Sequence, residues 1–474
     1  MAFLIGGANS AAATGGFEVA NSCRFNDGDS AKMLKEMGTA TDNKKFTFNC
    51  WLKRSTLGTN QVFAHARNGT SGPYFNMMFG TDDKLRVYGP DKDGGNDFDY
   101  KTTQVLRDVG AWYCITVAFD SSHATAGNRI RMYINGVEVT SFATETNPAE
   151  DVIYVGNYTG YDFGIGANLD NSAYFDGYIA ECVHIDGQQL TPSSFGEFDD
   201  DSPDIWKPID VSGLTFGNNG FYLDFEASDN LGNDANGGTD LTETNLAAAD
   251  QATDTPTNNF CTLNPLDNYY QGHTFSEGNL KMVTQANNTY TFSSGTFGLS
   301  SGKWYAECKL AASGGYADIG IANKVSSAKT DSLGGTANGG YAKHDFSSNV
   351  TALGSGVANG AALSVGNVCG VFLDLDNSKL YFSINGSLQN TTGIGITAAA
   401  STTNGNYFFC GGDEDGGSAV TLEWNFGGCS SFSLSSAVND DNGYGNFEYT
   451  PTVTVESTET KFYAVCTKNL AEYG

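Results

Sequence analysis

Two Ile-Asn-Gly hairpin signals, about 250 residues apart, constrain this 474-residue chain more than any other feature. The first lies in "RMYINGVEV" (131–139) and the second in "KLYFSINGSLQ" (379–389). Asn-Gly favours a two-residue hairpin turn because both residues tolerate positive φ. Each signal follows a long apolar, β-rich run, "AWYCITVAFD" or "VCGVFLDLD", which predicts a buried strand. This repeated pattern, a buried strand followed by an Ile-Asn-Gly hairpin, therefore predicts two strand-rich domains of one architecture.

The composition agrees with an all-β chain. Glycine is abundant at 59 residues, aromatic residues make up 12%, and runs rich in Ala, Leu, Glu and Lys are nearly absent. We expect four segments: an N-terminal segment (1–16), a β-sandwich (17–200), an acidic polar connector with one strand (201–262), and a second β-sandwich with a C-terminal extension (263–474). The connector is assigned because residues 227–259 hold almost no large apolar side chain.

The formal net charge of −29 excludes several classes of partner. An acidic surface repels nucleic acid and anionic lipid, so neither nucleic-acid binding nor membrane insertion is expected. No run reaches the roughly 18 apolar residues of a membrane helix, and "MAFLIGG" is too short for a signal peptide. The ten cysteines form no CxxC pair, which argues against structural zinc. Buried free thiols are expected, with disulfides left open by the even count.

Within this pattern, the first domain resembles a laminin-G-like, concanavalin A-type jelly roll. The stretches that carry the resemblance are "FTFNCWLKRS", "AWYCITVAFD", "RMYINGVEV" and "YFDGYIAECVHIDG". The second domain resembles the SPRY (B30.2) sandwich, through "LSSGKWYAECKL", "IGIA" and "VCGVFLDLDNSKLYFSINGS". The two resemblances imply an all-β protein of two tandem concanavalin A-like jelly-roll or β-sandwich domains.

The order of the modules also resembles a class of marine bacteriophage virion structural proteins. There, a lectin-like module and a SPRY-like module are joined by connectors that read here "NGFYLDF", "DTPTNN" and "TLNPLD". The resemblance implies a virion surface protein, a tail fibre or capsid decoration, assembled in the host cytoplasm. Such a protein contacts other virion proteins and self-associates, so a homo-oligomer is expected.

Three functions are open at this stage. The favoured one is host attachment through weak, multivalent contacts with host-surface glycans, because many copies on one particle raise avidity. The second is a purely architectural virion component without a ligand. The third is a glycan hydrolase. Fold resemblance by itself does not establish ligand binding.

Sugar binding needs an aromatic face with amide or carboxylate groups beside it. The loop-like stretches "NYTGYDFGIGANLDNSAYF" and "GGYAKHDFSSN" combine both kinds of residue. The candidate carbohydrate-binding residues are Tyr158, Tyr161, Asp162, Tyr174, Tyr341 and His344. The alternative is that these rings pack beneath their own loops or against another copy of the chain.

Calcium is the ion that the acidic loops favour, because hard cations take oxygen ligands. The candidate ligands are Asp27 and Asp29 in "RFNDGDSAKM", and Asp413 and Asp415 in "GGDEDGGS". Neither stretch has the full spacing of a calcium hand, and an acidic turn held by its own side chains is the favoured alternative for both.

No catalytic residue is predicted, so the chain is not expected to be an enzyme. Concanavalin-type hydrolases carry Glu-x-Asp-x-x-Glu on one strand face, and this string is absent. Asp224 and Glu226 lie two apart on one predicted strand, but a third acid is missing. The five histidines form no HxH or HExxH pair, so a catalytic zinc has no support.

Overall fold

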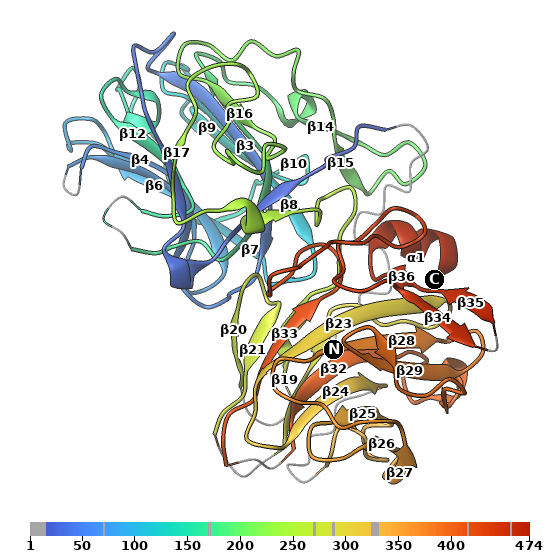
Figure 1. Cartoon of the computed structure of the whole chain (residues 1–474). Coiled ribbons are helices and arrows are strands. Elements are labelled where there is room, and N and C mark those ends of the chain that lie inside the picture. Colours follow the sequence, from blue (N-terminus) through green and yellow to red (C-terminus); the bar gives the residue numbers. More distant parts are fainter. Residues whose placement is uncertain are drawn as a thin grey trace. The chain divides into compact units, whose positions relative to one another are not determined.

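The computed structural model describes residues 16–69, 72–168, 170, 172–268, 272–286, 290–323, 331–414, 417–455 and 457–474. The chain divides into two compact units, an N-terminal unit (Ala13–Thr257) and a C-terminal unit (Asn258–Gly474) (Figure 1). Strands dominate both units, and α1 (Thr467–Tyr473) is the single α-helix of the described residues. The prediction of an all-β protein built from β-sandwiches is confirmed.

The described part of the N-terminal unit contains two eight-stranded antiparallel sheets. The first runs in the order β10 (Val137–Glu138), β9 (Ile130–Ile134), β8 (Trp112–Asp120), β3 (Lys45–Arg54), β13 (Gly177–Asp186), β1 (Ser22–Phe25), β18 (Gln251–Ala252), with β16 (Phe221–Leu223) paired to β13. The second runs β11 (Phe142–Thr146), β7 (Asp97–Val105), β6 (Lys84–Pro90), β5 (Tyr74–Phe79), β4 (Gln61–Arg67), β12 (Asp162–Ile165), β2 (Lys32–Glu36), β17 (Thr242–Thr244).

The core of this unit lies between the facing surfaces of its two sheets. Alternate residues of β3 point inward, so Phe46 and Phe48 meet rings from the opposite sheet. Phe46 lies 5.2 Å from Phe75 of β5, and Phe48 lies 5.6 Å from Phe163 of β12, measured between ring centroids. Full burial of each such side chain stabilises the fold by about 1.5–3 kcal/mol.

The acidic segment expected as a connector belongs to the N-terminal unit. Its strands β16, β17 and β18 extend the two sheets by pairing with β13, β2 and β1. Its carboxylates meet buried cations of the sandwich, which a solvated linker would not do. The pairs are Arg24 with Asp250 at 3.1 Å, Lys35 with Asp234 at 3.3 Å and Lys53 with Asp254 at 2.7 Å. The structure therefore places the boundary at residue 257 rather than at residues 200 and 262.

The C-terminal unit also packs two sheets, of seven and nine strands among its described residues, antiparallel except for the parallel pairing of β36 with β23. The first runs β19 (Leu263–Asn268), β22 (Thr291–Gly295), β32 (Phe408–Asp413), β24 (Ala317–Ala322), β25 (Tyr341–His344), β26 (Asn349–Ala352), β27 (Ser355–Ala358). The second runs β20 (Thr274–Ser276), β21 (Lys281–Val283), β33 (Thr421–Asn425), β23 (Lys303–Ala312), β28 (Val368–Asp374), β29 (Lys379–Ile384), β30 (Ser387–Leu388), with β31 (Ile394–Gly395) on β29 and β36 (Tyr463–Ala464) on β23.

Two short ribbons and six 3₁₀ turns complete the described elements. The ribbons are β14 (Gly196–Phe198) with β15 (Trp206–Pro208), and β34 (Thr452–Val455) with β35 (Thr458–Lys461). The 3₁₀ turns are η1 (Asp27–Asp29), η2 (Ala126–Asn128), η3 (Val155–Asn157), η4 (Pro192–Ser194), η5 (Ala248–Asp250) and η6 (Ala399–Ser401).

The two Ile-Asn-Gly hairpins have the same geometry in both units. Asn135 and Gly136 have φ of +50° and +76°, and Asn385 and Gly386 have φ of +49° and +76°. Two positive φ values in succession are the signature of a type I′ turn. Each asparagine also binds the neighbouring long strand: Asn135 Oδ1 accepts the N–H of Cys114, and Asn385 Oδ1 that of Val368, at 2.8 and 2.9 Å. The repeated Ile-Asn-Gly sequence therefore has two roles: it forms the turn, and its asparagine side chain fastens the turn to the neighbouring strand. We call this hydrogen bond the clamp.

Replacement of Asn135 tests this clamp. Asn135→Ala is expected to lower the free energy of unfolding by about 2–4 kcal/mol, because it leaves the part-buried N–H of Cys114 without its partner and because alanine tolerates positive φ less well than asparagine does. Asn135→Gly also removes the bond to the Cys114 N–H, but glycine adopts positive φ without strain. The free energy of unfolding should therefore fall less than in Asn135→Ala. Asn135→Asp keeps an acceptor and should stay near the wild type. Equal stability of all three variants in chemical denaturation would contradict the clamp.

Candidate functional site

A groove of about 550 Å³ lies on the N-terminal unit where the β9–β10 hairpin meets the β14–β15 ribbon. Its lining residues come from β9, the hairpin turn, η4 and the ribbon, and they are Arg131, Tyr133, Gly136, Thr191, Pro192, Ser193, Gly196, Glu197, Phe198, Trp206 and Ile209. We call it the hairpin groove.

The aromatic wall of the hairpin groove is built on Trp206. This indole packs against Gly136, where a Cβ atom would lie 2.3 Å from a ring carbon, so the turn glycine is needed for close approach as well as for its φ. Phe198 stands edge-on to Trp206, with ring centroids 4.9 Å apart. Phe198 is 42% exposed and Trp206 is 4% exposed. The buried indole therefore holds an open phenyl ring at the rim.

Charged groups of both signs surround this wall. Arg131 donates two hydrogen bonds to Glu138, at 2.8 and 2.6 Å, and these bonds hold the pKa of Glu138 below its usual value. The Arg131 guanidinium also lies 5.4 Å from the centre of the Tyr133 ring. On the ribbon, Lys207 pairs with Glu197 at 3.3 Å. An exposed ring flanked by hydrogen-bonding side chains is the arrangement that suits a pyranose.

Of the four residues predicted near β12, Tyr158 and Tyr161 come together, and none of the four lines the hairpin groove. Tyr158 and Tyr161 meet edge-on at 5.4 Å and pack, partly buried, against the core. Asp162 begins β12, where burial and the charge of Glu36 raise its carboxyl pKa. Tyr174 is half-buried in the segment before β13. Packing beneath their own loops, the alternative considered for these rings, fits Tyr158 and Tyr161.

The two residues predicted in the C-terminal unit do not face solvent. Tyr341 and His344 are each 1% exposed, so a stacking role against sugar does not fit their burial. The Tyr341 hydroxyl accepts the N–H of Thr397 at 2.9 Å. The rings that do reach solvent here are Tyr316 and Phe346, 44% and 47% exposed, with centroids 5.6 Å apart.

Two of the predicted calcium ligands occupy a hydrogen-bonded turn. Asp27 and Asp29 form η1, and Asp29 Oδ2 accepts the side-chain amide of Asn26 at 2.8 Å. Asp413 is buried at the end of β32 and accepts the hydroxyl of Thr284 at 3.2 Å. Asp415 lies outside the described residues. Asp27 and Asp29 therefore fit the acidic-turn alternative, whereas Asp413 is a buried strand residue.

One group of metal-ligating side chains does converge among the described residues. Asp318, His344 and Glu414 each bring one ligand atom within 4.8 Å of the others. His344 alone belongs to the sequence prediction, which assigned it to carbohydrate rather than metal.

The carboxylate pair Asp224 and Glu226 leads to an unpredicted third acid. Asp224 Oδ1 accepts the N–H of Glu226 at 3.1 Å, which makes Asp224 a turn former. Glu181 lies near both, 4% exposed, in an irregular stretch of β13 with φ of +48°. Burial raises the pKa of Glu181 to about 8, against the opposing bond from the Tyr222 hydroxyl at 2.8 Å. No sequence pattern indicated Glu181 as a site residue, because its strand reads as uniformly buried.

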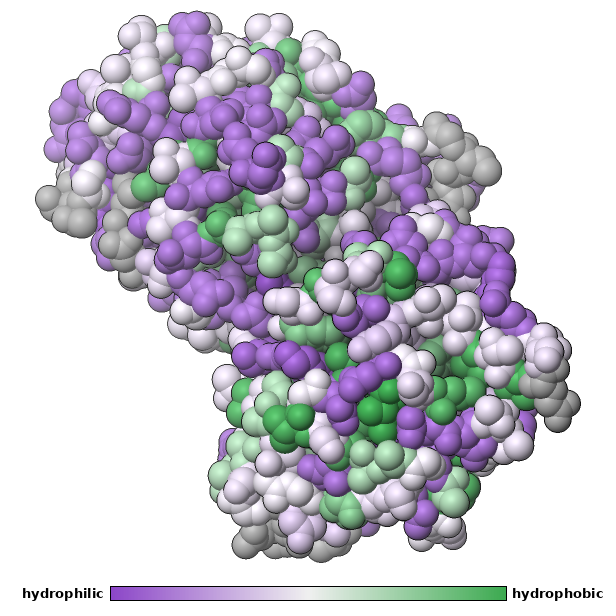
Figure 2. Space-filling model, viewed as in Figure 1, coloured by the Kyte–Doolittle hydropathy of each residue, from purple (hydrophilic) through white to green (hydrophobic). Residues whose placement is uncertain are grey.

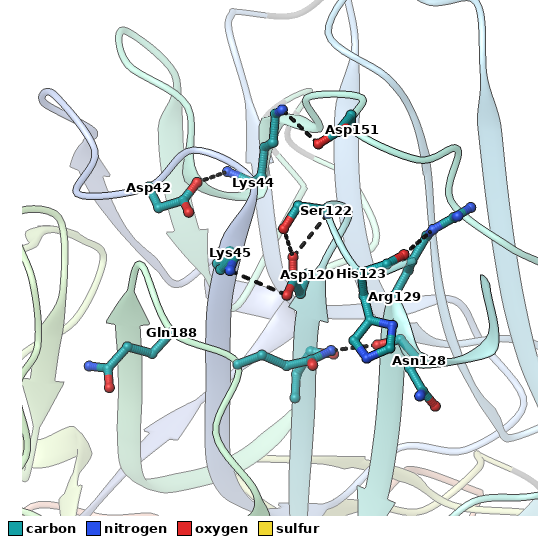
Figure 3. Close-up of polar contacts among 12 residues, drawn as sticks. Asp42, Lys44, Lys45, Asp120, Ser122, His123, Asn128, Arg129, Asp151 and Gln188 are labelled. Atoms are coloured by element: carbon teal, nitrogen blue, oxygen red, sulfur yellow. Dashed lines mark hydrogen bonds and ion pairs between the residues drawn. The ribbon is translucent and has the colours of Figure 1, made fainter. Parts of the chain in front are cut away.

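A polar network at the start of β3 and the end of β8 is self-contained (Figure 3). Asp120 accepts the N–H of Ser122 at 2.9 Å and lies 3.5 Å from the ammonium of Lys45. Lys44 pairs with Asp151 at 3.0 Å. These groups bind one another, so the network fastens the 120–129 loop to the sheet and is not favoured as a ligand site.

The C-terminal unit holds a second groove, of about 450 Å³. It is lined by Gly302, Lys303, Asp376, Glu459, Thr460, Lys461, Tyr463 and Tyr473. Its two tyrosines stack on each other at 4.0 Å, and Lys303 pairs with Asp376 at 2.6 Å. Because both tyrosines are only partly exposed and stack face to face, whereas Phe198 of the hairpin groove is exposed, this groove is the weaker candidate.

Residues 26–194 match the family model of the concanavalin A-like lectin/glucanases superfamily (Laminin_G_3). This match confirms the predicted laminin-G-like, concanavalin A-like module in the N-terminal unit. The matched segment includes β9 and the hairpin turn of the hairpin groove, while β14 and β15 lie beyond it. No curated protein shows significant sequence similarity to the chain. Within the described residues, no helix is long and apolar enough to span a bilayer.

Three solved structures illustrate the similarity in fold. The SPRY domain of human HERC1 is 12% identical (36% of this chain, 99% of that chain, TM-score 0.29). A proposed carbohydrate-binding protein from Bacteroides ovatus is 16% identical (48% and 59%, TM-score 0.34). Domain 4 of the arabinanase AbnA from Geobacillus stearothermophilus, solved with arabinotriose, is 18% identical (39% and 83%, TM-score 0.28). At these scores the similarities carry no argument about the ligand.

The buried acid Glu181 makes stability depend on pH. Its folded-state pKa of about 8 exceeds the ordinary value of 4.5, so the folded chain holds a proton that the unfolded chain releases. The stability of the N-terminal unit should therefore fall as pH rises from about 5 to 8, by an amount on the order of a few kcal/mol. Glu181→Gln should flatten this profile in denaturant unfolding.

The matched control is Glu145→Gln, which removes an exposed carboxylate from β11 of the same unit. It should leave the slope between pH 5 and 8 unchanged. A Glu181→Gln variant that keeps the wild-type slope would contradict the assignment.

Proposed function

We propose that this protein binds carbohydrate through the hairpin groove, as a lectin-like module without catalytic turnover. The observation that carries the proposal is the exposed Phe198 ring, held by buried Trp206 and flanked by Arg131 and Glu197. An aromatic face provides an apolar surface for the C–H side of a sugar, and the neighbouring charged groups can bind its hydroxyls. The concanavalin A-like fold of residues 26–194 supports the proposal, although fold does not fix ligand.

The setting we propose is the surface of a bacteriophage virion, as a tail fibre or capsid decoration that contributes to host attachment. This setting is supported by the sequence resemblance to bacteriophage virion proteins, which covers the two sandwich modules and the connector segments between them. In that setting the partners are other virion proteins and further copies of this chain, and assembly takes place in the host cytoplasm. A shallow groove gives weak single contacts, which many copies on one particle would combine into tight adhesion.

A purely architectural role is the second candidate. The observation that favours it is the extent of internal pairing: the charges of the Figure 3 network and the rings near β12 are engaged within the chain. A hydrolase role has less support, because Asp224 is bound to its own turn and Glu181 is buried.

Loss of the exposed ring tests the carbohydrate proposal. A glycan array with the full chain would identify a ligand, and Phe198→Ala should then weaken its binding about tenfold, which corresponds to about 1.4 kcal/mol. Tyr88→Ala is the matched control, since it removes a partly exposed ring of the same unit that neither lines the groove nor belongs to the predicted binding residues, and it should leave affinity unchanged. Absence of binding to every glycan, or equal losses in both variants, would count against the hairpin groove.

Competition with intact particles tests the proposed setting. If the protein mediates attachment, the free chain should reduce adsorption of phage particles that carry it, and Phe198→Ala should reduce that inhibition. Antibody labelling should place the chain on the outside of the particle. Surface labelling without inhibition would favour the architectural role, and failure to label any particle would contradict a virion location.

A further inference from the structure

A cluster of three metal-ligating side chains lies at one end of the seven-stranded sheet of the C-terminal unit. Asp318 of β24 and His344 of β25 are direct cross-strand partners, and this register places their side chains on the same face. Glu414 follows β32, the strand on the other side of β24, and its N–H donates to the carbonyl of Tyr316 at 2.7 Å. Three neighbouring strands therefore deliver the three side chains to one point.

The ligand atoms are close enough to share one ion. His344 Nδ1 lies within hydrogen-bonding distance of Asp318 Oδ1 and 3.9 Å from Glu414 Oε2. The side chains of Asp318 and His344 are 0% and 1% exposed, while that of Glu414 is 17% exposed. Two carboxylates and an imidazole thus converge in a mostly dry place, where uncompensated charge is costly.

One buried oxygen in the cluster lacks a normal hydrogen bond. Asp318 Oδ2 is inaccessible to water and accepts no hydrogen bond of ordinary geometry, although the Leu333 N–H approaches this carboxyl group. Such an orphaned buried atom destabilises the fold, and more so when it is charged. The nearest cationic side chain in sequence turns elsewhere: Lys343 Nζ donates to the carbonyls of Ser348 and Asn359. A bound cation would satisfy the carboxylate.

The second imidazole nitrogen of His344, Nε2, already has a hydrogen-bond partner. His344 Nε2 lies 2.7 Å from the hydroxyl of Thr351 on β26. When Nε2 carries the proton and donates it to Thr351, the lone pair of Nδ1 points to the two carboxylates. Hydrogen-bond partners on the nitrogen that does not bind the metal orient metal-binding histidines in this way. Phe346 covers the imidazole at 4.5 Å between ring centroids, which limits water on that side.

We propose that Asp318, His344 and Glu414 bind a divalent transition-metal ion of the zinc class. A nitrogen ligand with two carboxylate oxygens suits zinc and cobalt, whereas calcium takes six to eight oxygen ligands. Three protein ligands leave a position for water or for an outside ligand. This site belongs to the C-terminal unit and does not depend on the sugar-binding proposal.

The test is zinc titration of the full chain after dialysis against a chelator, by calorimetry at pH 7.5 and physiological salt. We expect one zinc ion per chain with a Kd on the order of micromolar or tighter. Cobalt as a probe should give visible absorption bands, and zinc should raise the unfolding temperature. Glu414→Gln should weaken zinc binding at least about tenfold, and Thr351→Val should weaken it by about 10–100-fold through loss of orientation.

Glu459→Gln is the matched control, because it removes the same charge from exposed β35 and should leave zinc binding unchanged. His344→Gln should abolish binding; if that variant fails to fold, the less buried Glu414 and Thr351 carry the test. Absence of saturable zinc binding, preference for calcium, or equal affinity of wild type and Glu414→Gln would overturn the proposal. Each of these results is independent of whether any glycan binds.

Discussion

Removal of water from the facing surfaces of paired sheets is the constraint on which the rest of this structure depends. A strand has two faces, and a twisted sheet is stable only when one of them is covered by another layer. In the N-terminal unit, phenylalanines of β3 meet those of β4, β5 and β12 in the covered layer. In the C-terminal unit, Leu422 and Trp424 of β33 pack close to Gly411 of β32, where a Cβ atom would lie 2.7 Å from Leu422 and 3.0 Å from the indole. The candidate sites therefore lie outside the covered layer, at turns and at the ends of strands.

This constraint explains where the two candidate sites lie. The hairpin groove forms where a covering ribbon meets a hairpin, so that one aromatic side chain is buried as an anchor and the next remains open. The Asp318–His344–Glu414 cluster forms where three strands of one sheet end together. Both sites use the sheet as a rigid frame that fixes side-chain direction, which is how β-sandwiches commonly separate stability from recognition.

The acidic composition has different consequences inside and outside the protein. Inside the N-terminal unit, the buried cations Arg24, Lys35 and Lys53 are paired with carboxylates of the 201–257 segment, and these pairs fasten that segment to the unit. Outside, hydrophilic side chains cover most of the N-terminal unit on the face shown in Figure 2, while apolar patches are more frequent over the C-terminal unit. A surface of this sign favours metal cations and neutral sugars over phosphate-rich partners.

The sequence by itself determined the strands, their turns and the presence of two sandwiches. Alternation in "KKFTFNCWLKRS" and the two Asn-Gly turns are local patterns, set by a period of two and by the backbone freedom of two residues. Tertiary structure decided which side chains meet, because antiparallel register joins residues far apart in the chain. Phe198 and Arg131 share a groove across 67 positions, and Asp318 meets His344 across 26. It also decided exposure: Tyr341 looked like a loop aromatic in sequence, but neighbouring strands bury it. No local pattern records which strand will lie alongside, so burial and convergence follow only once the sheets are assembled.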